Sequence, residues 1–373
     1  MRVGIHSGFT FLSFRAKSRN LLLFPETFRD VSTPLDMTKQ RAFQRAVLGW
    51  YRERGRDLPW RRTRDPYAVL VSEFMLQQTQ VGTVLPHYKD WLRRFPNFAA
   101  LARASEAEVL HAWQGLGYYN RARNLHATAK IVATRHCEHF PRSIDQLQQL
   151  PGVGKYTAHA IATFAFDQPV AIIEANTSRL LSRLLDLRIP IDSTAGRNAL
   201  WNSASALTPK KAPAAYNSAL LDLGALVCLP RQPKCGICPV KRFCRAKNPK
   251  SLPIKRPRPG TKQLVEKHAF VVEHDKVLLE KSPARWRGMW ILPPVKLDGF
   301  KPSSLPHPIY TAVFPFTNHR VALKVFRQRL RQIDNGKCWF PFRKLDSIPI
   351  PSPHRRAIDA LLGLNVSSVH AQR

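Results

Sequence analysis

The sequence contains few acidic residues for its size. Aspartate and glutamate together number 25, against 59 lysines and arginines, which gives a formal net charge of +34. A chain this basic would not stay free among cellular polyanions, so the imbalance predicts a surface for nucleic acid. A highly charged soluble protein and a ribosome-type binder share this balance, and charge alone excludes neither.

Long apolar runs are also lacking. Near the start, the longest run of aliphatic and aromatic residues is Leu21–Phe24, whereas a membrane span needs about 20 apolar residues. We therefore expect no membrane segment. The first 36 residues are basic and have no small-residue cleavage signature, which argues against a secretory signal and leaves a transit peptide as an open alternative. We interpret residues 1–36 as an extension, disordered or due to a mis-assigned start, with Met37 as the alternative first residue.

Cysteines are scarce and unevenly placed. Four of the six fall within 17 positions, at Cys228, Cys235, Cys238 and Cys244. A disulfide framework would be spread along the chain, so this grouping predicts a metal-ligand cluster in a reducing compartment. Four thiolates at this spacing suit an iron–sulfur cluster or tetrahedral zinc, and spacing alone does not separate the two. We interpret the isolated Cys137 and Cys338 as core thiols.

Helical periodicity dominates residues 38–246. One apolar face recurs at i, i+3, i+4, i+7 and i+8 in Tyr67, Leu70, Val71, Phe74 and Met75. Residues 143–150, 157–166 and 178–187 also have helical patterns, whereas sustained strand alternation is absent. Further on, residues 269–280 predict a hairpin, residues 321–325 a half-buried strand and residues 352–363 a closing helix. The chain is thus expected to be mainly α, with an α+β domain at its C-terminal end.

A basic, proline-rich segment separates the two parts. Residues 245–262 hold seven basic residues, four prolines and no acidic residue, which predicts an extended, exposed linker. Its charge would suit a phosphate backbone, and a solvated tether explains it equally well. We therefore divide the chain into a helical domain at 37–246, a linker at 247–262 and a second domain at 263–373.

A glycine-rich turn between two helical patterns forms a second local motif. Residues 150–158 read LPGVGKYTA, with Gly152 and Gly154 in the turn and Lys155 directly after it. Such a turn presents backbone N–H groups at the start of a helix, which is an arrangement that receives a phosphate. A lone Gly-x-Gly would be a weak signal, but the helical flanks and the lysine strengthen it.

Several motifs occur in a fixed order. They are LPWR at 58–61, SEFMLQQTQV at 72–81, GLGYY at 115–119 followed by RARNL at 121–125, the glycine turn and the cysteine loop. Together they resemble MutY-type adenine DNA glycosylases of the helix–hairpin–helix superfamily, strongly over 38–246 and weakly over 263–365. The resemblance implies a helix–hairpin–helix glycosylase fold with an iron–sulfur loop. It also implies a 4Fe–4S cluster on the four cysteines, which leaves zinc a minor alternative.

The resemblance assigns catalytic roles to two carboxylates. Glu73 matches the family's catalytic acid, which protonates N7 of adenine and needs a pKa raised by burial. The departing base leaves an oxocarbenium-like sugar that calls for a nearby anion, and Glu174 takes this role, as a stabiliser of the charge or as a nucleophile. Here the family usually has Asp-Gly-Asn, whereas this chain has Glu174, Ala175 and Asn176, so the reach is longer and a glycine is lost. Asn176 would orient the carboxylate or cap a helix, and a helix cap is also the alternative for Glu174.

Position along the helix adds an expectation about where Glu73 lies. Glu73, Gln77 and Gln80 have i, i+4 and i+7 spacing, off the apolar face. We therefore expect all three on one helix flank that borders a groove, outside the core.

Other matched positions concern the sugar and the DNA. Tyr156 stands where strand-cleaving relatives have a lysine that forms a Schiff base, and a tyrosine cannot form that imine. A monofunctional enzyme is expected. Gln78 and Tyr118 match residues that the family inserts into the base stack, and Arg61 of the first motif is counted among the DNA contacts.

The second domain resembles the MutT-like C-terminal domain of the same family through residues 276–280 and 287–293. It lacks the acidic run of a metal-dependent hydrolase, so a recognition domain is expected. In the family a Phe-Ser-His loop inspects 8-oxoguanine. The nearest match here is Thr317–His319, with His319 as the contact and the stacking phenylalanine displaced or absent. A solvent-facing turn histidine is the alternative.

The sequence thus predicts a monofunctional, monomeric adenine DNA glycosylase. Its partner would be double-stranded DNA with adenine opposite 8-oxoguanine or guanine, and its location the cytoplasm, at the nucleoid. Two alternatives stay open, namely a non-catalytic iron–sulfur lesion binder and a glycosylase for another mispaired base.

Overall fold

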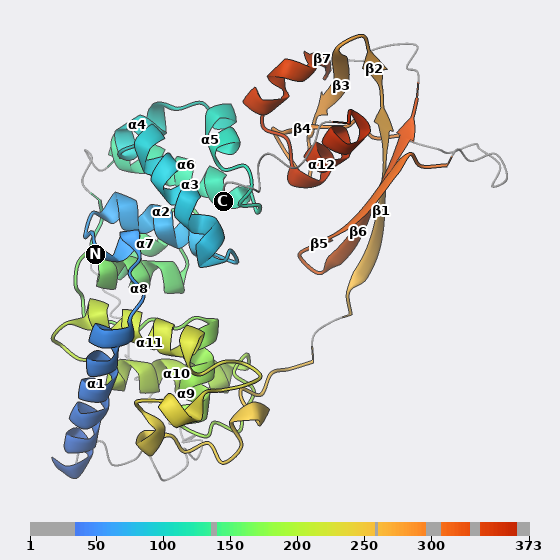
Figure 1. Ribbon diagram of the computed structural model, residues 1–373. Coiled ribbons are helices and arrows are strands. Elements are labelled where there is room, and N and C mark those ends of the chain that lie inside the picture. Colours follow the sequence, from blue (N-terminus) through green and yellow to red (C-terminus); the bar gives the residue numbers. More distant parts are fainter. Residues whose placement is uncertain (1–33, 136–139, 258–259, 296–306, 329–335, 364–373) are drawn as a thin grey trace, which may run out of the picture.

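We describe the protein from a computed structural model, which covers residues 34–135, 140–257, 260–295, 307–328 and 336–363 (Figure 1). The segment 1–33, which holds most of the expected extension, and Cys137 lie outside the described residues. Within the described residues, no helix has both the length and the hydropathy needed to cross a bilayer.

The chain is helical up to the cysteine loop (Figure 1). Local signals set several helix starts: Asp65, for example, accepts hydrogen bonds from Tyr67 N (3.1 Å) and Ala68 N (3.2 Å), and Pro66 occupies the first turn. The helices are α1 (Pro34–Arg54), η2 (Pro59–Arg61), α2 (Pro66–Leu76), α3 (Val81–Arg94), α4 (Phe98–Arg103), α5 (Glu106–Ala112), α6 (Asn120–Arg135), α7 (Ile144–Gln148), α8 (Lys155–Phe164), α9 (Ala175–Leu184), α10 (Thr194–Leu207) and α11 (Pro213–Leu226).

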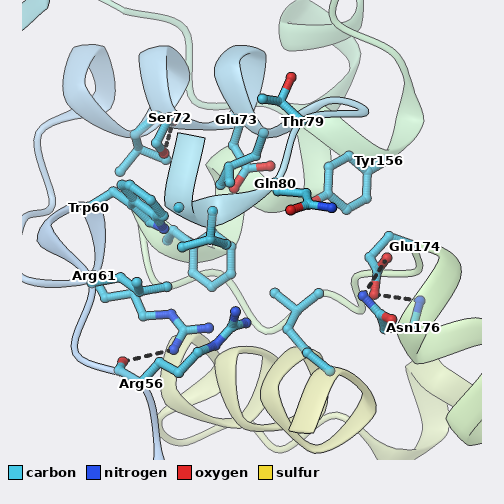
Figure 2. A pocket seen from close by; sticks show the side chains of 18 residues that line it. Arg56, Trp60, Arg61, Ser72, Glu73, Thr79, Gln80, Tyr156, Glu174 and Asn176 are labelled. Atoms are coloured by element: carbon cyan, nitrogen blue, oxygen red, sulfur yellow. Dashed lines mark hydrogen bonds between the residues drawn. The ribbon is translucent and has the colours of Figure 1, made fainter. Parts of the chain in front are cut away.

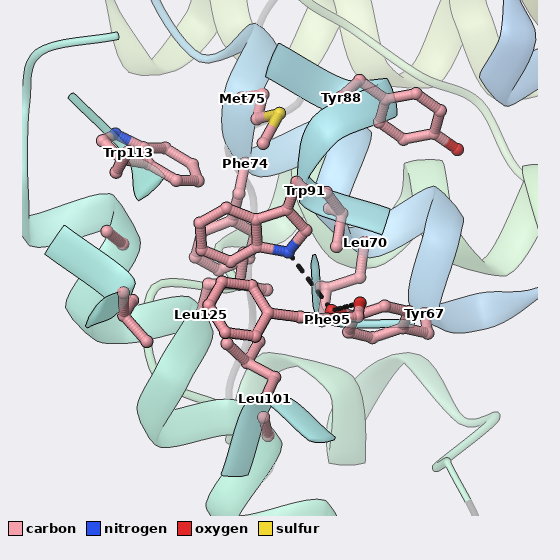
Figure 3. Packing of buried hydrophobic residues seen from close by; sticks show 14 of the residues in the cluster. Tyr67, Leu70, Phe74, Met75, Tyr88, Trp91, Phe95, Leu101, Trp113 and Leu125 are labelled. Carbon is pink, nitrogen blue, oxygen red and sulfur yellow. Dashed lines mark hydrogen bonds between the residues drawn. The ribbon is translucent and has the colours of Figure 1, made fainter. Parts of the chain in front are cut away.

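Two apolar cores organise these helices. The first contains α2 to α8, with the predicted face of α2 buried throughout. Its centre is aromatic: Trp91 Nε1 donates to the Tyr67 hydroxyl (3.2 Å), which donates to Phe95 O (2.6 Å; Figure 3). The second core joins α1, α9, α10 and α11 to the start of the cysteine loop. Helices α2 and α8 therefore face α9 and α11 across the boundary between two separately packed halves.

Strands are found only from residue 262 onward among the described residues. Parallel strands β1 (Lys262–Phe270) and β6 (His319–Arg327) form one sheet with β5 (Tyr310–Phe316), antiparallel to β6. The other sheet contains β2 (Val272–Glu273), β3 (Lys276–Lys281), β4 (Trp290–Ile291) and β7 (Lys337–Pro341). Helix η7 (Phe342–Ser347) and α12 (Ser352–Leu361) complete this part. The predicted hairpin, half-buried strand and closing helix are confirmed.

The segment expected to be a linker makes specific contacts with the helical domain. Leu252 is 2% exposed, and its carbonyl accepts a hydrogen bond from Arg183 Nε (3.1 Å). Ile191 N donates to Ile254 O (3.0 Å), and Arg256 N donates to the Asp192 carboxylate. The basic segment is therefore not exposed throughout, because two side chains and one backbone N–H of the helical domain bind residues 252–256.

Candidate active site

A cavity of about 450 Å³ lies at the boundary between the two helical cores. Side chains from α2, α8, the start of α9 and α11 line it, and Glu73 and Glu174 approach it from different sides (Figure 2). Its size and its mixture of apolar walls with a few polar groups are typical of a site for a small organic group. Lining residues are Arg56, Leu58, Trp60, Arg61, Val69, Ser72, Glu73, Leu76, Thr79, Gln80, Val81, Gly82, Tyr156, Phe164, Glu174, Asn176, Leu221 and Ala225.

Glu73 lies on α2 and is 4% exposed. Burial raises the pKa of its carboxyl to about 7, while a hydrogen bond with the Tyr156 hydroxyl and the charge of Arg61 act against that rise. Its Oε2 atom is buried and has no hydrogen-bond partner among the described residues. A large share of the molecules therefore keep this proton at neutral pH, and one oxygen of the carboxyl is left for a ligand in the cavity.

Glu73 borders the cavity, but the prediction that it shares one helix flank with Gln77 and Gln80, outside the core, is wrong. The Glu73 side chain is buried, and α2 ends at Leu76, so Gln77 and Gln80 are not on that helix. Gln80 still reaches the cavity, but as the residue that precedes α3. The helix ends early because a side chain from a distant part of the sequence binds its last carbonyls, as described below.

The glycine turn orients Tyr156 toward Glu73. Gly152 has φ +75°, and a Cβ there would lie 2.7 Å from Asn124 Nδ2, so only glycine fits. Gly154 precedes α8, which begins at Lys155 and places Tyr156 in the cavity lining. Burial and the nearby carboxylates raise the pKa of Tyr156 well above its usual value, which keeps the hydroxyl a hydrogen-bond donor.

Lys155 does not line the cavity. Its Nζ lies 4.0 Å from the centre of the Trp201 ring on α10, an arrangement in which the ring face attracts the ammonium group. The lysine beside the tyrosine is therefore held on the outer side of the turn, away from Glu73.

Glu174 caps α9. Its carboxylate accepts hydrogen bonds from Asn176 N (2.7 Å) and Thr177 N (3.0 Å), and the Thr177 side chain binds Glu174 N in return. The cap and the cavity position coexist, so the predicted alternatives do not exclude each other. Ala175 is the first residue of the helix, without positive φ, so the expected loss of backbone freedom on replacing glycine has no effect here.

Asn176 links this carboxylate to the rest of the protein. Its Nδ2 lies 3.3 Å from Glu174 Oε2, and its Oδ1 accepts from Arg179 (2.7 Å). Arg179 in turn donates to Gly224 O and to Cys228 O. Asn176 thus both orients the carboxylate and lies within the first turn of α9, and its position depends on the start of the cysteine loop.

Arg61 contacts the opposite wall through a residue that the sequence analysis missed. Asp222 on α11 is fully buried and accepts from Arg61 (2.7 and 2.8 Å) and from Arg56 (2.8 Å). The signal in the sequence was an acidic residue inside an apolar helix of a strongly basic chain. The arrangement fixes two guanidinium groups at the wall of the cavity.

Gln78 and Tyr118 lie in two neighbouring turns and share an unusual backbone conformation. Their φ angles are +57° and +46°, which non-glycine residues adopt only where the surroundings enforce it. Both side chains are exposed, Tyr118 by 43%. These features suit residues that project from the surface toward a large partner.

Arg121 holds both turns and was not assigned a role from the sequence. Its guanidinium is 7% exposed and donates to six oxygen atoms. The acceptors are the carbonyls of Phe74, Met75, Gln77, Leu116 and Gly117 and the hydroxyl of Thr79. By donating to the carbonyls at the end of α2, this one side chain both stops the helix and ties it to the Tyr118 turn.

The four cysteines line a second cavity of about 400 Å³. Among the described residues none of the four forms a disulfide; Cys228 is buried, and Cys235 and Cys244 are exposed. Arg183, which is 1% exposed, donates to Cys228 Sγ (3.3 Å) and to three carbonyls of this loop. Four sulfur donors around one cavity, with a cation beside them, fit an anionic iron–sulfur cluster. Cys338 is exposed, so its interpretation as a core thiol is wrong.

In the C-terminal domain, Thr317 and Asn318 form the turn between β5 and β6, and His319 begins β6 half-buried. Phe316 precedes them, but its ring packs against Trp286 (centroids 5.5 Å apart) and beneath Arg285 (4.6 Å). The ring of the phenylalanine next to the predicted recognition turn therefore packs within the protein.

Family comparisons agree with this arrangement. Residues 71–197 match the family model for HhH-GPD superfamily base excision DNA repair proteins, and residues 228–244 match the iron–sulfur binding domain of endonuclease III. A solved thermostable thymine-DNA glycosylase aligns with 56% of this chain and 96% of its own, at a TM-score of 0.52 and 31% identity. The class is therefore the iron–sulfur branch of the helix–hairpin–helix glycosylase superfamily, which confirms the predicted fold and 4Fe–4S cofactor.

The relatives specify the family further. The adenine DNA glycosylase of Buchnera aphidicola subsp. Schizaphis graminum is 30% identical over 340 residues, which cover 85% of this chain and 98% of the relative. This chain belongs to the adenine DNA glycosylase family. The mouse adenine DNA glycosylase is 44% identical over 220 residues, but these make up only 43% of its length, so the chain spans less than half of that relative.

Proposed function

We propose that this protein excises adenine from double-stranded DNA by hydrolysing its N-glycosidic bond, where adenine is mispaired with 8-oxoguanine or guanine. The observation that carries the proposal is the pair of glutamates. Glu73 has a pKa raised to about 7 and an oxygen without a partner among the described residues, whereas Glu174 is oriented by helix amides at the same cavity. That the excised base is adenine is inferred from membership of the adenine DNA glycosylase family.

The two carboxyl groups have different roles in the proposed reaction. Glu73 donates its proton to N7 of the everted adenine, which turns a poor leaving group into a good one. As the bond to the sugar breaks, positive charge develops on the deoxyribose. The Glu174 carboxylate stabilises that charge, held in place by Asn176. Water then adds to the sugar, and the proton that it releases returns to the Glu73 carboxylate, which completes the hydrolysis.

We propose that the enzyme does not cleave the strand. Tyr156 occupies the lysine position of the strand-cleaving relatives, and its hydroxyl contacts Glu73. The neighbouring Lys155 is stacked on Trp201 and is not among the residues that line the cavity. No amine is therefore directed at the sugar carbon from this turn.

The remaining predicted residues form the DNA surface in this proposal. The backbone around Gly152 and Gly154, together with Lys155, contacts a phosphate, and Arg61 lines the cavity. Gln78 and Tyr118 enter the stack and fill the space left by the flipped base, which offsets part of the cost of flipping. His319 and the Thr317–Asn318 turn meet the opposite base. The four cysteines hold the cluster that shapes the neighbouring loop. We also propose that the enzyme acts as a monomer, in the cytoplasm, at the nucleoid.

A base-release assay tests the proposal. Duplexes with adenine opposite 8-oxoguanine, adenine opposite guanine and cytosine opposite 8-oxoguanine are incubated with excess protein, with and without alkali. We expect free adenine and alkali-dependent cleavage at the adenine in the first two only. Binding without release of adenine would favour the lesion binder, and release of another base from a mismatch panel would favour a different glycosylase. Cleavage without alkali would contradict the monofunctional proposal.

A further inference from the structure

Three aromatic side chains cross the boundary between the helical domain and the C-terminal domain. Tyr119 and Trp286 meet edge to face, with ring centroids 6.3 Å apart. Trp286 then meets Phe316 at 5.5 Å, also edge to face. We call Tyr119, Trp286 and Phe316 the aromatic bridge. Tyr119 and Trp286 are 5% and 9% exposed, so the bridge is a packed interface within one chain.

The two ends of the bridge adjoin two proposed DNA-contacting turns. Tyr119 directly follows Tyr118, the exposed residue with φ +46°. Phe316 directly precedes the Thr317–Asn318 turn, and it pairs with His319 across the β5–β6 hairpin. Paired residues point to the same face of a sheet, so Phe316 and His319 lie side by side.

Further contacts fix the Trp286 loop against α5 and α6. Arg123 on α6 pairs with Glu106 (2.8 Å) and donates to Arg287 O. Gly288 has φ +79°, and a Cβ there would lie 3.3 Å from Glu106 Oε1. Met289, in the same loop, is fully buried in the first core of the helical domain. The loop that carries Trp286 thus contacts the helical domain at several points.

We propose that Trp286 is a positioning residue for opposite-base discrimination. It sets the Thr317–His319 turn relative to the Tyr118 turn, so that the residue inserted into the stack and the residues that meet the opposite base engage the same mispair together. The inference rests on the proposed function. Trp286 itself touches neither substrate nor the catalytic carboxyl groups; it acts through Tyr119 and Phe316.

The expected consequence is selective. If Trp286 is truncated, the C-terminal turn loses its fixed position, but Glu73, Tyr156 and Glu174 keep theirs, because none of their described contacts involves this loop. The preference for adenine opposite 8-oxoguanine over adenine opposite guanine should therefore fall about tenfold, the size that two lost aromatic contacts supply. The excision rate opposite guanine should change by less than about threefold, since the proposal assigns the turn to inspection of 8-oxoguanine.

The experiment compares full-length Trp286→Ala, Trp286→Phe and Trp339→Ala with the wild type. Trp339 is a matched control, because it packs on a different cluster of the same domain. Single-turnover excision at saturating enzyme is measured on both mispairs, with thermal unfolding of each variant. We expect Trp286→Ala to lose the preference, Trp286→Phe to restore most of it and Trp339→Ala to keep it.

A double-substitution test separates positioning from general damage. If Trp286 acts through the turn, Trp286→Ala should add little to the lost preference of His319→Ala. An unchanged preference in Trp286→Ala, or equal losses on both mispairs that Trp286→Phe fails to restore, would overturn the inference. A wild type that releases no adenine from either mispair would instead refute the proposed function, whereas a wild type that releases adenine equally from both would overturn this inference alone.

Discussion

The two walls of the proposed active site carry the same kind of side chain in opposite surroundings. On the α2 wall, Glu73 is enclosed by apolar residues, its pKa is raised to about 7, and one oxygen has no partner among the described residues. On the α9 wall, Glu174 receives backbone N–H groups at the positive end of a helix. Two glutamates can therefore act as acid and as anion because of where their helices place them.

The largest expected effect comes from removing the proton donor. Glu73→Gln keeps the shape but cannot donate to N7, so we expect single-turnover excision to fall by about 10³-fold or more, within the range of general acid catalysis. Binding of the mispaired duplex should be retained within a few-fold. A variant that excised adenine at a tenth of the wild-type rate would contradict the role of Glu73.

The same substitution should stabilise the protein at neutral pH. Glu73 has a folded pKa near 7 against an unfolded value of 4.5. Above pH 7 the folded protein must therefore hold an ionised carboxylate that burial disfavours, which lowers the free energy of unfolding by about 3 kcal/mol. Glu73→Gln should raise the free energy of unfolding by up to this amount above pH 7, and the gain should vanish as the pH falls to about 4.5. Denaturant unfolding at several pH values measures the gain, and a loss of stability at pH 8 would contradict the burial argument.

The next largest effect on the excision rate is expected from removing the carboxylate on the α9 wall. Glu174→Gln removes the anion and should slow excision by about 10²-fold, the size reported by loss of one preorganised electrostatic group. Because Glu174 also caps α9, a cost of about 1 kcal/mol in stability should accompany the loss of rate. The effects on rate and on stability can be separated with Glu174→Ser, because serine can cap α9 but carries no charge. If Glu174→Ser excised adenine at the wild-type rate, the carboxylate would be only structural.

A smaller effect concerns the pH dependence. Excision should fall above about pH 7 as Glu73 ionises. The hydrogen bond from Tyr156 favours the ionised carboxylate, so Tyr156→Phe should move this falling limb to higher pH, by less than about one unit. Rates at saturating enzyme from pH 5.5 to 9 measure the shift. A limb that stayed in place, or moved to lower pH, would show that Tyr156 does not act on Glu73.

The smallest effect is expected from Glu174→Asp, which gives the family's usual side chain at this position. Aspartate keeps both the cap and the charge, so the rate should change by less than about fivefold and stability by a few tenths of a kcal/mol. The comparison of single-turnover rates tells whether the extra methylene of Glu174 matters. A loss as large as that of Glu174→Gln would mean that the cavity is shaped around the longer side chain.

Sequence patterns predicted what depends on neighbours along the chain. The buried face of α2, the hairpin of β2 and β3, and the half-buried alternation of β6 all follow from local periodicity. The cysteine spacing likewise predicted a common cavity. The end of α2 could not be predicted this way, because no glycine or proline marks it: Arg121, 45 residues beyond Leu76, stops the helix by binding its carbonyls.

The site was predicted unevenly for the same reason. Glu73 was identified from a motif, but the helix flank outside the core that it was to share with Gln77 and Gln80 was wrong, because the end of α2 and the packing around Glu73 depend on distant segments. Asp222 and Trp286 carried no motif, and their roles come from contacts with Arg61 and Phe316 that only the folded chain makes. The stacking phenylalanine was predicted to be displaced or absent, and the phenylalanine that precedes the recognition turn, Phe316, packs against Trp286.

The guanidinium of Arg121 has a consequence for how this family can vary. Since one side chain serves the turns of Gln78 and Tyr118 alike, neither turn can gain or lose a residue without shifting the other. We therefore expect distant relatives to carry insertions elsewhere on the surface, and we expect these two turns to keep the same length in them. Even a lysine at 121 would fail, because three donors on a flexible stem cannot reach six fixed oxygens.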